Sequence, residues 1–182
     1  MSAPHADRGS SARRGGLIVP VPEAEQVVQA WHARLHPSEQ ALPAHVTLLF
    51  PFLTLTEIDP ANLAWLQAYF AGLPAVDVSF STVGRFPDVV YLGPEPRNWF
   101  VRCTEALTAR FGLLPYGGLH QEIVPHLTVA RHADPQVCAE AAQALTQVLP
   151  ITTRVNAAWL MEETEAGRWT HTATFPFGPP PP

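Results

Sequence analysis

One short motif occurs twice in the chain and limits the folds open to it. Histidine, an aliphatic residue, threonine and a second aliphatic residue follow one another as HVTL at 45–48 and as HLTV at 126–129. A proline stands just before each copy, at Pro43 and Pro125. Alternate side chains of a β-strand point to opposite faces, so each copy places its histidine and threonine on one face and its aliphatic residues on the other. The fold therefore needs two short strands that each bury one face and keep the other polar.

The segments around these motifs alternate between strand-like and helix-like patterns. Asp-Pro pairs that begin at Asp59 and Asp134 predict helix starts, because aspartate caps a helix and proline suits its first turn. The apolar spacing predicts helices over 22–35, 59–72, 96–111 and 134–150, and strands over 17–21, 45–50, 76–81, 89–92, 125–130, 151–161 and 169–175. This mixture with short links favours an α+β fold with antiparallel sheets and two similar halves, rather than a doubly wound parallel sheet.

Composition and charge restrict the partners. With 47% apolar and 15% charged residues the chain can bury a core, and no apolar stretch has membrane-spanning length. The net charge is −5 and all eleven basic residues are arginine, which is too few cations to neutralise a long run of phosphates. We therefore expect a short nucleic-acid end or a nucleotide as ligand, with no membrane partner and no extended nucleic-acid surface. The absence of lysine excludes Schiff-base chemistry and a phosphate-loop lysine.

The two ends of the chain differ in composition from the rest. The first sixteen residues are polar and lack the apolar segment of a secretory signal, and the last residues are mostly proline. We expect a disordered leader over 1–16, a single domain over 17–177 and a flexible tail over 178–182. Cys103 and Cys138 fall on the apolar stripes of helices, which indicates core positions rather than a disulfide. A reducing cytoplasm is the expected compartment.

Two strands of this kind, side by side, would bring two imidazoles and two hydroxyls to one cleft. That set suits a phosphodiester: one of His45 and His126 can act as base and the other as acid, while Thr47 and Thr128 donate to the non-bridging oxygens. The residues do not decide which histidine is the acid. The plainer alternative is that both histidines only begin strands at a sheet edge.

Phe50 and Arg131 each follow a motif histidine by five residues. In a regular strand such a residue faces away from the histidine, so a bulge or a strand end is needed to turn either side chain into the cleft. A core position for Phe50 and a solvated salt bridge for Arg131 are the alternatives. Glu162 and Glu163 fall in the final hairpin and are expected to be solvated turn charges.

The paired motifs resemble the two-histidine (2H) phosphoesterase superfamily, which includes bacterial 2′-5′ RNA ligases and RNA 2′,3′-cyclic phosphodiesterases. PAHVTLLFPF is similar to its first motif, VPHLTVAR to its second, and GRFPDVVYLG to the strand pair between them. The resemblance implies a bilobal fold of duplicated lobes, with antiparallel sheets flanked by helices around a central cleft, and no metal or cofactor. The implied activity is hydrolysis of 2′,3′-cyclic phosphate ends of RNA or nucleotides to 2′-phosphates, together with reversible 2′-5′ ligation.

The resemblance also implies roles for individual residues. His45 is the general acid and His126 the general base, and the implied partners are short RNA ends or cyclic nucleotides bound by a monomer. The substrate-binding residues are Thr47, Thr128 and Arg131 at the phosphate and Phe50 beside the nucleobase. Two alternatives for the whole protein are a non-catalytic nucleotide-binding module and a 2H phosphodiesterase for another small cyclic phosphate.

Overall fold

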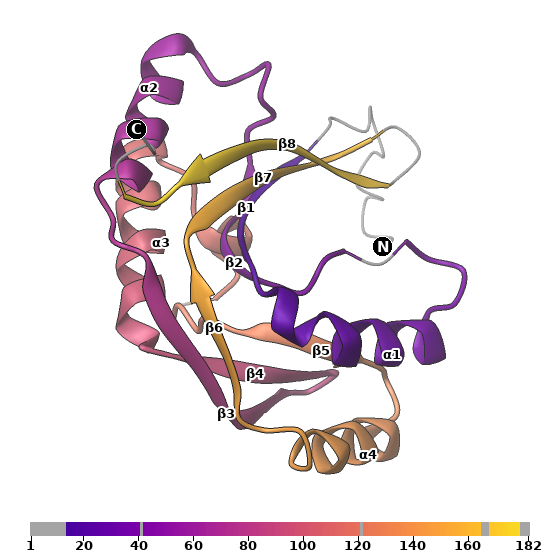
Figure 1. The fold of residues 1–182 in the computed structure, drawn as a ribbon. Helices are drawn as coiled ribbons and strands as arrows, with labels where there is room; N and C mark the ends of the chain where they lie inside the picture. The colour runs from indigo at the N-terminus through magenta and orange to yellow at the C-terminus, as the bar shows by residue number, and fades with distance from the viewer. Residues whose placement is uncertain (1–13, 41, 121, 165–167, 179–182) are drawn as a thin grey trace, which may run out of the picture.

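The computed structural model describes residues 14–40, 42–120, 122–164 and 168–178. The first thirteen residues of the predicted leader and the last four of the predicted tail lie outside this described part. Figure 1 shows two sheets with helices on their outer sides. In chain order the elements are β1 (Gly15–Pro20), η1 (Pro22–Ala24), α1 (Glu25–Leu35), β2 (His45–Phe52), α2 (Pro60–Ala71), β3 (Val76–Phe86), β4 (Val89–Glu95), α3 (Arg97–Phe111), η2 (Pro115–Gly118), β5 (Leu127–Arg131), α4 (Pro135–Leu145), β6 (Ile151–Val155), β7 (Ala157–Glu163) and β8 (Trp169–Pro176).

Each sheet has four strands, and all neighbouring strands are antiparallel. Sheet A has the order β2-β1-β7-β8, and sheet B has the order β5-β4-β3-β6. Helices α2 and α3 contact sheet A, and α1 and α4 contact sheet B (Figure 1). An ion pair between Arg34 and Glu140, 2.9 Å long, joins α1 to α4. The predicted α+β class with two similar lobes is confirmed.

The helix starts agree with the caps that the sequence predicts. The Asp59 carboxylate accepts the backbone N–H of Asn62, and the Asp134 carboxylate accepts that of Gln136. Each cap satisfies a backbone donor that has no partner inside the helix. Helix α3 ends at Gly112, whose φ of 68° lies in the left-handed region that glycine adopts without a steric penalty.

The core explains how the two motifs are held. Val46 and Leu48 of β2, and Leu127 and Val129 of β5, are at most 4% exposed. The histidine and threonine of each motif lie on the opposite, half-buried face. The aliphatic half of each motif therefore anchors its strand, as the alternation predicts.

Several predicted boundaries are wrong; the strands predicted over 76–81 and 89–92, for example, extend to Phe86 and Glu95. Strand β1 begins at Gly15 because this residue already pairs with Phe52 and Glu162 on its two sides. The predicted helix over 134–150 ends at Leu145, after which the backbone forms turns. The predicted strand over 151–161 is two strands in different sheets: β6 pairs with β3 in sheet B, and β7 pairs with β1 and β8 in sheet A. In the described part of the chain no helix has the length and apolarity that a membrane span requires.

Candidate active site

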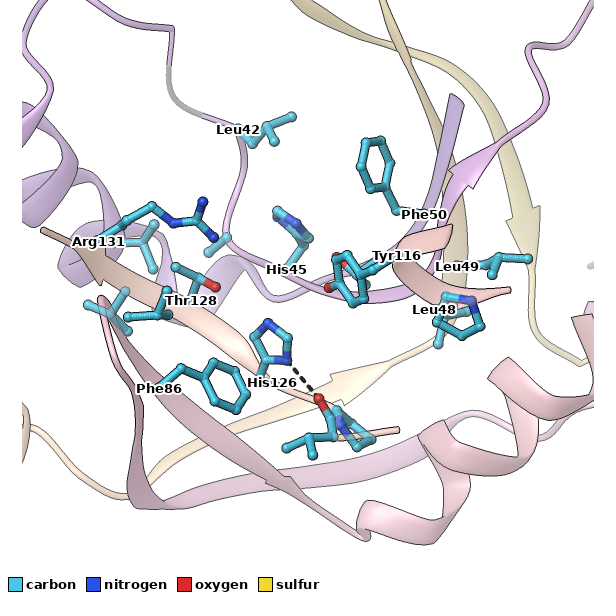
Figure 2. Close-up of a pocket in the computed structure, with 18 of the residues that line it drawn as sticks. Leu42, His45, Leu48, Leu49, Phe50, Phe86, Tyr116, His126, Thr128 and Arg131 are labelled. Atoms are coloured by element: carbon cyan, nitrogen blue, oxygen red, sulfur yellow. Dashed lines mark hydrogen bonds between the residues drawn. The ribbon is translucent and has the colours of Figure 1, made fainter. Parts of the chain in front are cut away.

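The two motifs lie at the facing edges of the two sheets. Strand β2 is the edge of sheet A and β5 the edge of sheet B, and the two strands are in contact. His45 begins β2, and His126 immediately precedes β5. Both histidines, with Thr47 and Thr128, line one cleft of about 2100 Å³ between the lobes (Figure 2). The structure thus brings the predicted catalytic residues and both threonines together.

The two imidazole rings are anchored in the same way. Nδ1 of His45 lies 2.6 Å from the carbonyl oxygen of Pro43, and Nδ1 of His126 lies 2.7 Å from that of Val124 (dashed in Figure 2). A carbonyl oxygen can only accept, so Nδ1 carries the proton in both rings. In the neutral ring Nε2 is then an unprotonated acceptor, and in the charged ring it is a donor. Each ring can therefore serve as a base or as an acid through Nε2.

Two β-bulges at equivalent positions turn Phe50 and Arg131 into the cleft. In β2 the pairing with β1 passes from Thr47 to Leu49, which leaves Leu48 without a partner. In β5 the pairing with β4 passes from Thr128 to Ala130 in the same way. The extra residue of a bulge reverses the facing of all residues that follow it. This is why a residue five positions after each histidine lines the cleft.

A buried hydrogen bond supports the bulge in β2. The Thr104 hydroxyl of α3, 3% exposed, donates to the carbonyl oxygen of Leu48 over 2.8 Å. Leu48 is the residue that the bulge leaves out of the β1 pairing. The helix therefore supplies a donor that stabilises the irregular backbone beside the site.

Different charges surround the two histidines. Burial and the neighbouring His126 lower the pKa of His45, and the Pro43 hydrogen bond and the Glu25 carboxylate act in the opposite direction without reversing it. Burial also lowers the pKa of His126, where the Arg131 guanidinium lowers it further. The Glu25 carboxylate accepts the backbone N–H of Ala44 over 2.6 Å, directly before His45. A negative group thus favours the protonated form of His45, and a positive group favours the neutral form of His126.

The His126 ring also rests on an aromatic support from sheet B. Its centroid lies 5.2 Å from that of Phe86 and 5.5 Å from that of Tyr91. Tyr91 in turn covers the backbone of Gly84, where any Cβ would collide with the tyrosine ring. Glycine is needed there because the aromatic ring approaches the strand so closely.

An aromatic wall forms the sheet A side of the cleft. Phe50 is half-buried and meets Trp169 edge-on, with 5.8 Å between ring centroids. The Arg14 guanidinium lies 5.5 Å from the Phe50 centroid. A Cβ on Gly16 would stand 3.4 Å from the Phe50 ring and 3.8 Å from Trp169, which are ordinary contact distances, so both rings pack directly over the β1 backbone. Phe50 is a wall residue of the cleft and not a core residue.

The exposed Arg131 also lines the cleft and forms no ion pair with any described residue.

Sequence reasoning missed Tyr116, which the structure places in the cleft beside the two histidines (Figure 2). The Tyr116 ring lies 6.4 Å from that of His126, with an angle of 23° between the planes, and 6.4 Å from that of Phe50. Trp169 was also missed. It comes from β8, and β1 and β7 lie between β8 and β2 in sheet A. The only sequence signal for Tyr116 is the Gly117-Gly118 pair that follows it.

The carboxylates of the final hairpin have structural roles, and their interpretation as solvated turn charges is wrong. Glu162 accepts the backbone N–H of Leu55 and the hydroxyl of Thr172, and Glu163 forms an ion pair of 2.7 Å with Arg14. The described residues contain no group of three or more histidine, cysteine or acidic side chains arranged to hold a metal ion.

Comparisons with known sequences give one family. The family model of the 2′-5′ RNA ligase superfamily matches residues 19–167. A protein of Bacillus pumilus (strain SAFR-032) that bears the general name phosphoesterase is 25% identical over 170 residues, which cover 90% of this chain and 96% of that protein. A protein of Geobacillus kaustophilus (strain HTA426) with the same general name is 25% identical over 168 residues, covering 90% of this chain and 95% of its own length.

Comparisons with solved structures give the same fold. TT0787 of Thermus thermophilus matches with a TM-score of 0.61 and 22% identity, over 90% of this chain and 97% of its own. E. coli LigT in its apo form matches with a TM-score of 0.58 and 20% identity, over 93% of this chain and 99% of its own. At these identities the likeness shows the fold alone.

Proposed function

Because this chain belongs to the 2′-5′ RNA ligase superfamily of two-histidine phosphoesterases, we propose that it hydrolyses 2′,3′-cyclic phosphate ends of RNA or nucleotides to 2′-phosphates without a metal ion. The observation that carries the proposal is the matched pair of imidazoles. In both rings a backbone carbonyl holds Nδ1–H, so Nε2 is available in the cleft. An acid and a base on two edge strands of one cleft are what opening a cyclic phosphodiester requires.

The proposed step moves two protons and exchanges one P–O bond for another. Nε2 of His126 takes a proton from water as the water oxygen attacks phosphorus. The bond between phosphorus and the ribose 3′ oxygen breaks, and Nε2–H of His45 protonates that oxygen. The product is a 2′-phosphate with a free 3′-hydroxyl. The two histidines end with exchanged protonation states, which proton exchange with solvent restores.

The surrounding charges support this assignment of acid and base. An acid must begin protonated and a base must begin neutral. Burial lowers the pKa of both histidines; the Glu25 carboxylate opposes this at His45, and the Arg131 guanidinium adds to it at His126. The same assignment follows from the family resemblance of the two motifs.

Three groups are proposed to hold the phosphate. Thr47 and Thr128 line the cleft two residues after the histidines, and Arg131 lines it at the end of β5. Hydroxyl and guanidinium donors stabilise the charge that develops on the non-bridging oxygens during attack. These donors are the reason that we expect no metal ion in the reaction.

The aromatic wall is the proposed site of the nucleoside. Phe50 and Trp169 present half-buried rings beside the motif strands, and aromatic rings bind nucleobases by stacking. The similar fold of E. coli LigT has been solved with NADP+, 3′-AMP and ATP, which supports a nucleotide as the ligand here. A 5′-hydroxyl in place of water would give a 2′-5′ phosphodiester, so the same groups would also serve ligation.

Turnover of 2′,3′-cyclic AMP by the purified chain tests the proposal. Chromatography against 2′-AMP and 3′-AMP standards identifies the product, and a second assay adds an RNA with a 5′-hydroxyl to detect ligation. His126→Ala is expected to abolish turnover. His171→Ala is the matched control, because His171 is exposed on β8 and does not line the cleft.

The result separates the proposal from its alternatives. Formation of 2′-AMP supports the proposal. Tight binding of the cyclic nucleotide without turnover would indicate a nucleotide-binding module. Turnover of ADP-ribose cyclic phosphate alone would indicate a phosphodiesterase for a different small cyclic phosphate.

A further inference from the structure

Tyr116 adopts a backbone conformation that tyrosine rarely takes. Its φ is 51° and its ψ 33°, and it is the one described residue other than glycine with a positive φ. Gly117 and Gly118, which follow it, also have positive φ values of 65° and 79°. A side chain with a Cβ destabilises this left-handed conformation, and glycine adopts it without that cost. A tyrosine at the first of the three positions therefore needs a reason beyond the turn itself.

Burial of apolar surface does not provide that reason. All three side chains line the cleft, but Leu114 and Leu119 are 56% and 82% exposed, whereas the more polar Tyr116 is half-buried in it. A loop that served only to cover the core would place these side chains the other way round. The orientation of Tyr116 therefore indicates a role inside the cleft.

The surroundings of the phenol belong to the proposed phosphate site. Burial is the largest influence on the pKa of Tyr116 and raises it, while the Thr47 hydroxyl and the Arg131 guanidinium lower it. The net direction is upward, so the phenol stays protonated and is a donor. The ring lies between His126 and Phe50, and Figure 2 shows it beside the two histidines. The hydroxyl group is thus close to Thr47 and within the influence of Arg131, two of the proposed phosphate donors.

We propose that Tyr116 contacts the substrate directly and donates its O–H to a non-bridging oxygen of the phosphate, beside Thr47. This inference rests on the proposed function and adds a third hydroxyl to the two threonines. The left-handed backbone is what carries the phenol from the η2 segment into the space between the strands. A donor held in advance stabilises the transition state without reorganising during the reaction.

Tyr116→Phe is the direct test, since it keeps the ring and removes only the hydroxyl. We expect kcat/KM for 2′,3′-cyclic AMP to fall about 10- to 100-fold, mainly in kcat, as for the loss of one transition-state hydrogen bond. The affinity for 2′-AMP, measured by calorimetry, should also fall at least about fivefold. Tyr69→Phe is the control: this phenol on α2 interacts with Cys103, outside the cleft, and its loss should leave both readouts unchanged.

A second variant separates a contact with substrate from a structural role. Tyr116→Gly relieves the left-handed backbone, so we expect an unfolding temperature close to that of the wild type with activity no higher than that of Tyr116→Phe. Wild-type kcat/KM and wild-type affinity for 2′-AMP in Tyr116→Phe would overturn the proposal, whatever Tyr116→Gly shows. A wild-type protein that fails to turn over any cyclic phosphate would contradict the proposed function, and the 2′-AMP affinity would still decide the role of Tyr116.

Discussion

Replacing Glu25 with glutamine tests which histidine is the acid. Glu25 begins α1, and its two carboxylate oxygens accept the backbone N–H of Ala44 over 2.6 Å and the side-chain amide of Gln29 over 2.7 Å. Its charge raises the pKa of His45, the residue after Ala44. Glutamine retains an oxygen that accepts the Ala44 N–H and removes the charge. The change is therefore mainly electrostatic.

The size of the effect follows from the distance and from the competing influences. One hydrogen bond and one residue separate the Glu25 carboxylate from the His45 imidazole, so the distance between the two groups is on the order of 7 Å. At that distance a unit charge contributes about 0.6 kcal/mol at the dielectric constant of water and about 2.4 kcal/mol at an effective value of 20. Glu25 is the weakest influence on His45, after burial, Pro43 and His126, so we expect its contribution to lie near the lower of these two energies.

The assay is the pH dependence of kcat/KM for 2′,3′-cyclic AMP, which reports the acid and base of the free enzyme. As the acid, His45 must be protonated, so activity is lost as pH rises through its pKa. Glu25→Gln lowers that pKa further, and the alkaline limb should move to lower pH by the small amount that a contribution of about 0.6 kcal/mol allows. The acidic limb, set by neutralisation of His126, should stay in place. The control Glu23→Gln removes an exposed carboxylate of η1 and should move neither limb.

Two outcomes would contradict this reasoning. Movement of the acidic limb to lower pH would make His45 the base and His126 the acid. If neither limb moves, and the unfolding temperature equals that of the wild type, the Glu25 charge does not act on the catalytic pair.

Three further predictions concern the pair, the metal and the bulge. His45→Ala and His126→Ala should each lower turnover by about 10²- to 10⁴-fold with an unchanged circular dichroism spectrum. The double variant should be little less active than the less active single variant, and fully additive losses would exclude a shared transition state. Turnover should survive exhaustive treatment with EDTA, because Arg131 and the two threonines meet the phosphate charge, and a loss that one divalent metal reverses would refute this. Thr104→Val should lower the free energy of unfolding in urea by about 1–3 kcal/mol, because the buried Leu48 carbonyl loses its donor, whereas Thr104→Ser should change it little.

The facing of the motif residues could be predicted because a strand has a period of two. His45 and Thr47 share a face for that reason alone, and the same holds for His126 and Thr128. The sequence also indicated that Phe50 needs a bulge or a strand end to reach the same face. It did not locate the bulge, because two adjacent buried apolar residues are compatible with many local backbones.

The missing parts of the site depend on contacts between distant segments. Trp169 reaches Phe50 only because β8 lies beyond β1 and β7 in sheet A, and one sequence does not specify strand order. Glu25 is held near His45 by a hydrogen bond from the Ala44 N–H, nineteen residues away in the chain, and acts on His45 through its charge. Tyr116 lies in a conformation that its residue type disfavours, so propensity predicts against it. Patterns along the chain therefore predict the strands of the site but not the residues that surround them.

The duplicated backbone and the differing side chains have separate consequences for the proposed reaction. Both lobes present a histidine anchored to the carbonyl two residues before it, a threonine, and a bulge that turns the fifth residue inward. Identical surroundings would give the two imidazoles equal pKa values. The state with His45 protonated and His126 neutral would then be as populated as the state with His126 protonated and His45 neutral. The fifth residue is Phe50 in one lobe and Arg131 in the other, and only His45 has a carboxylate, Glu25, acting on it. The symmetric backbone thus provides two similar proton-transfer groups whose pKa values are both lowered by burial. Glu25 and Arg131 are the charges that differ between the lobes, and in the proposed reaction they favour His45 as the acid.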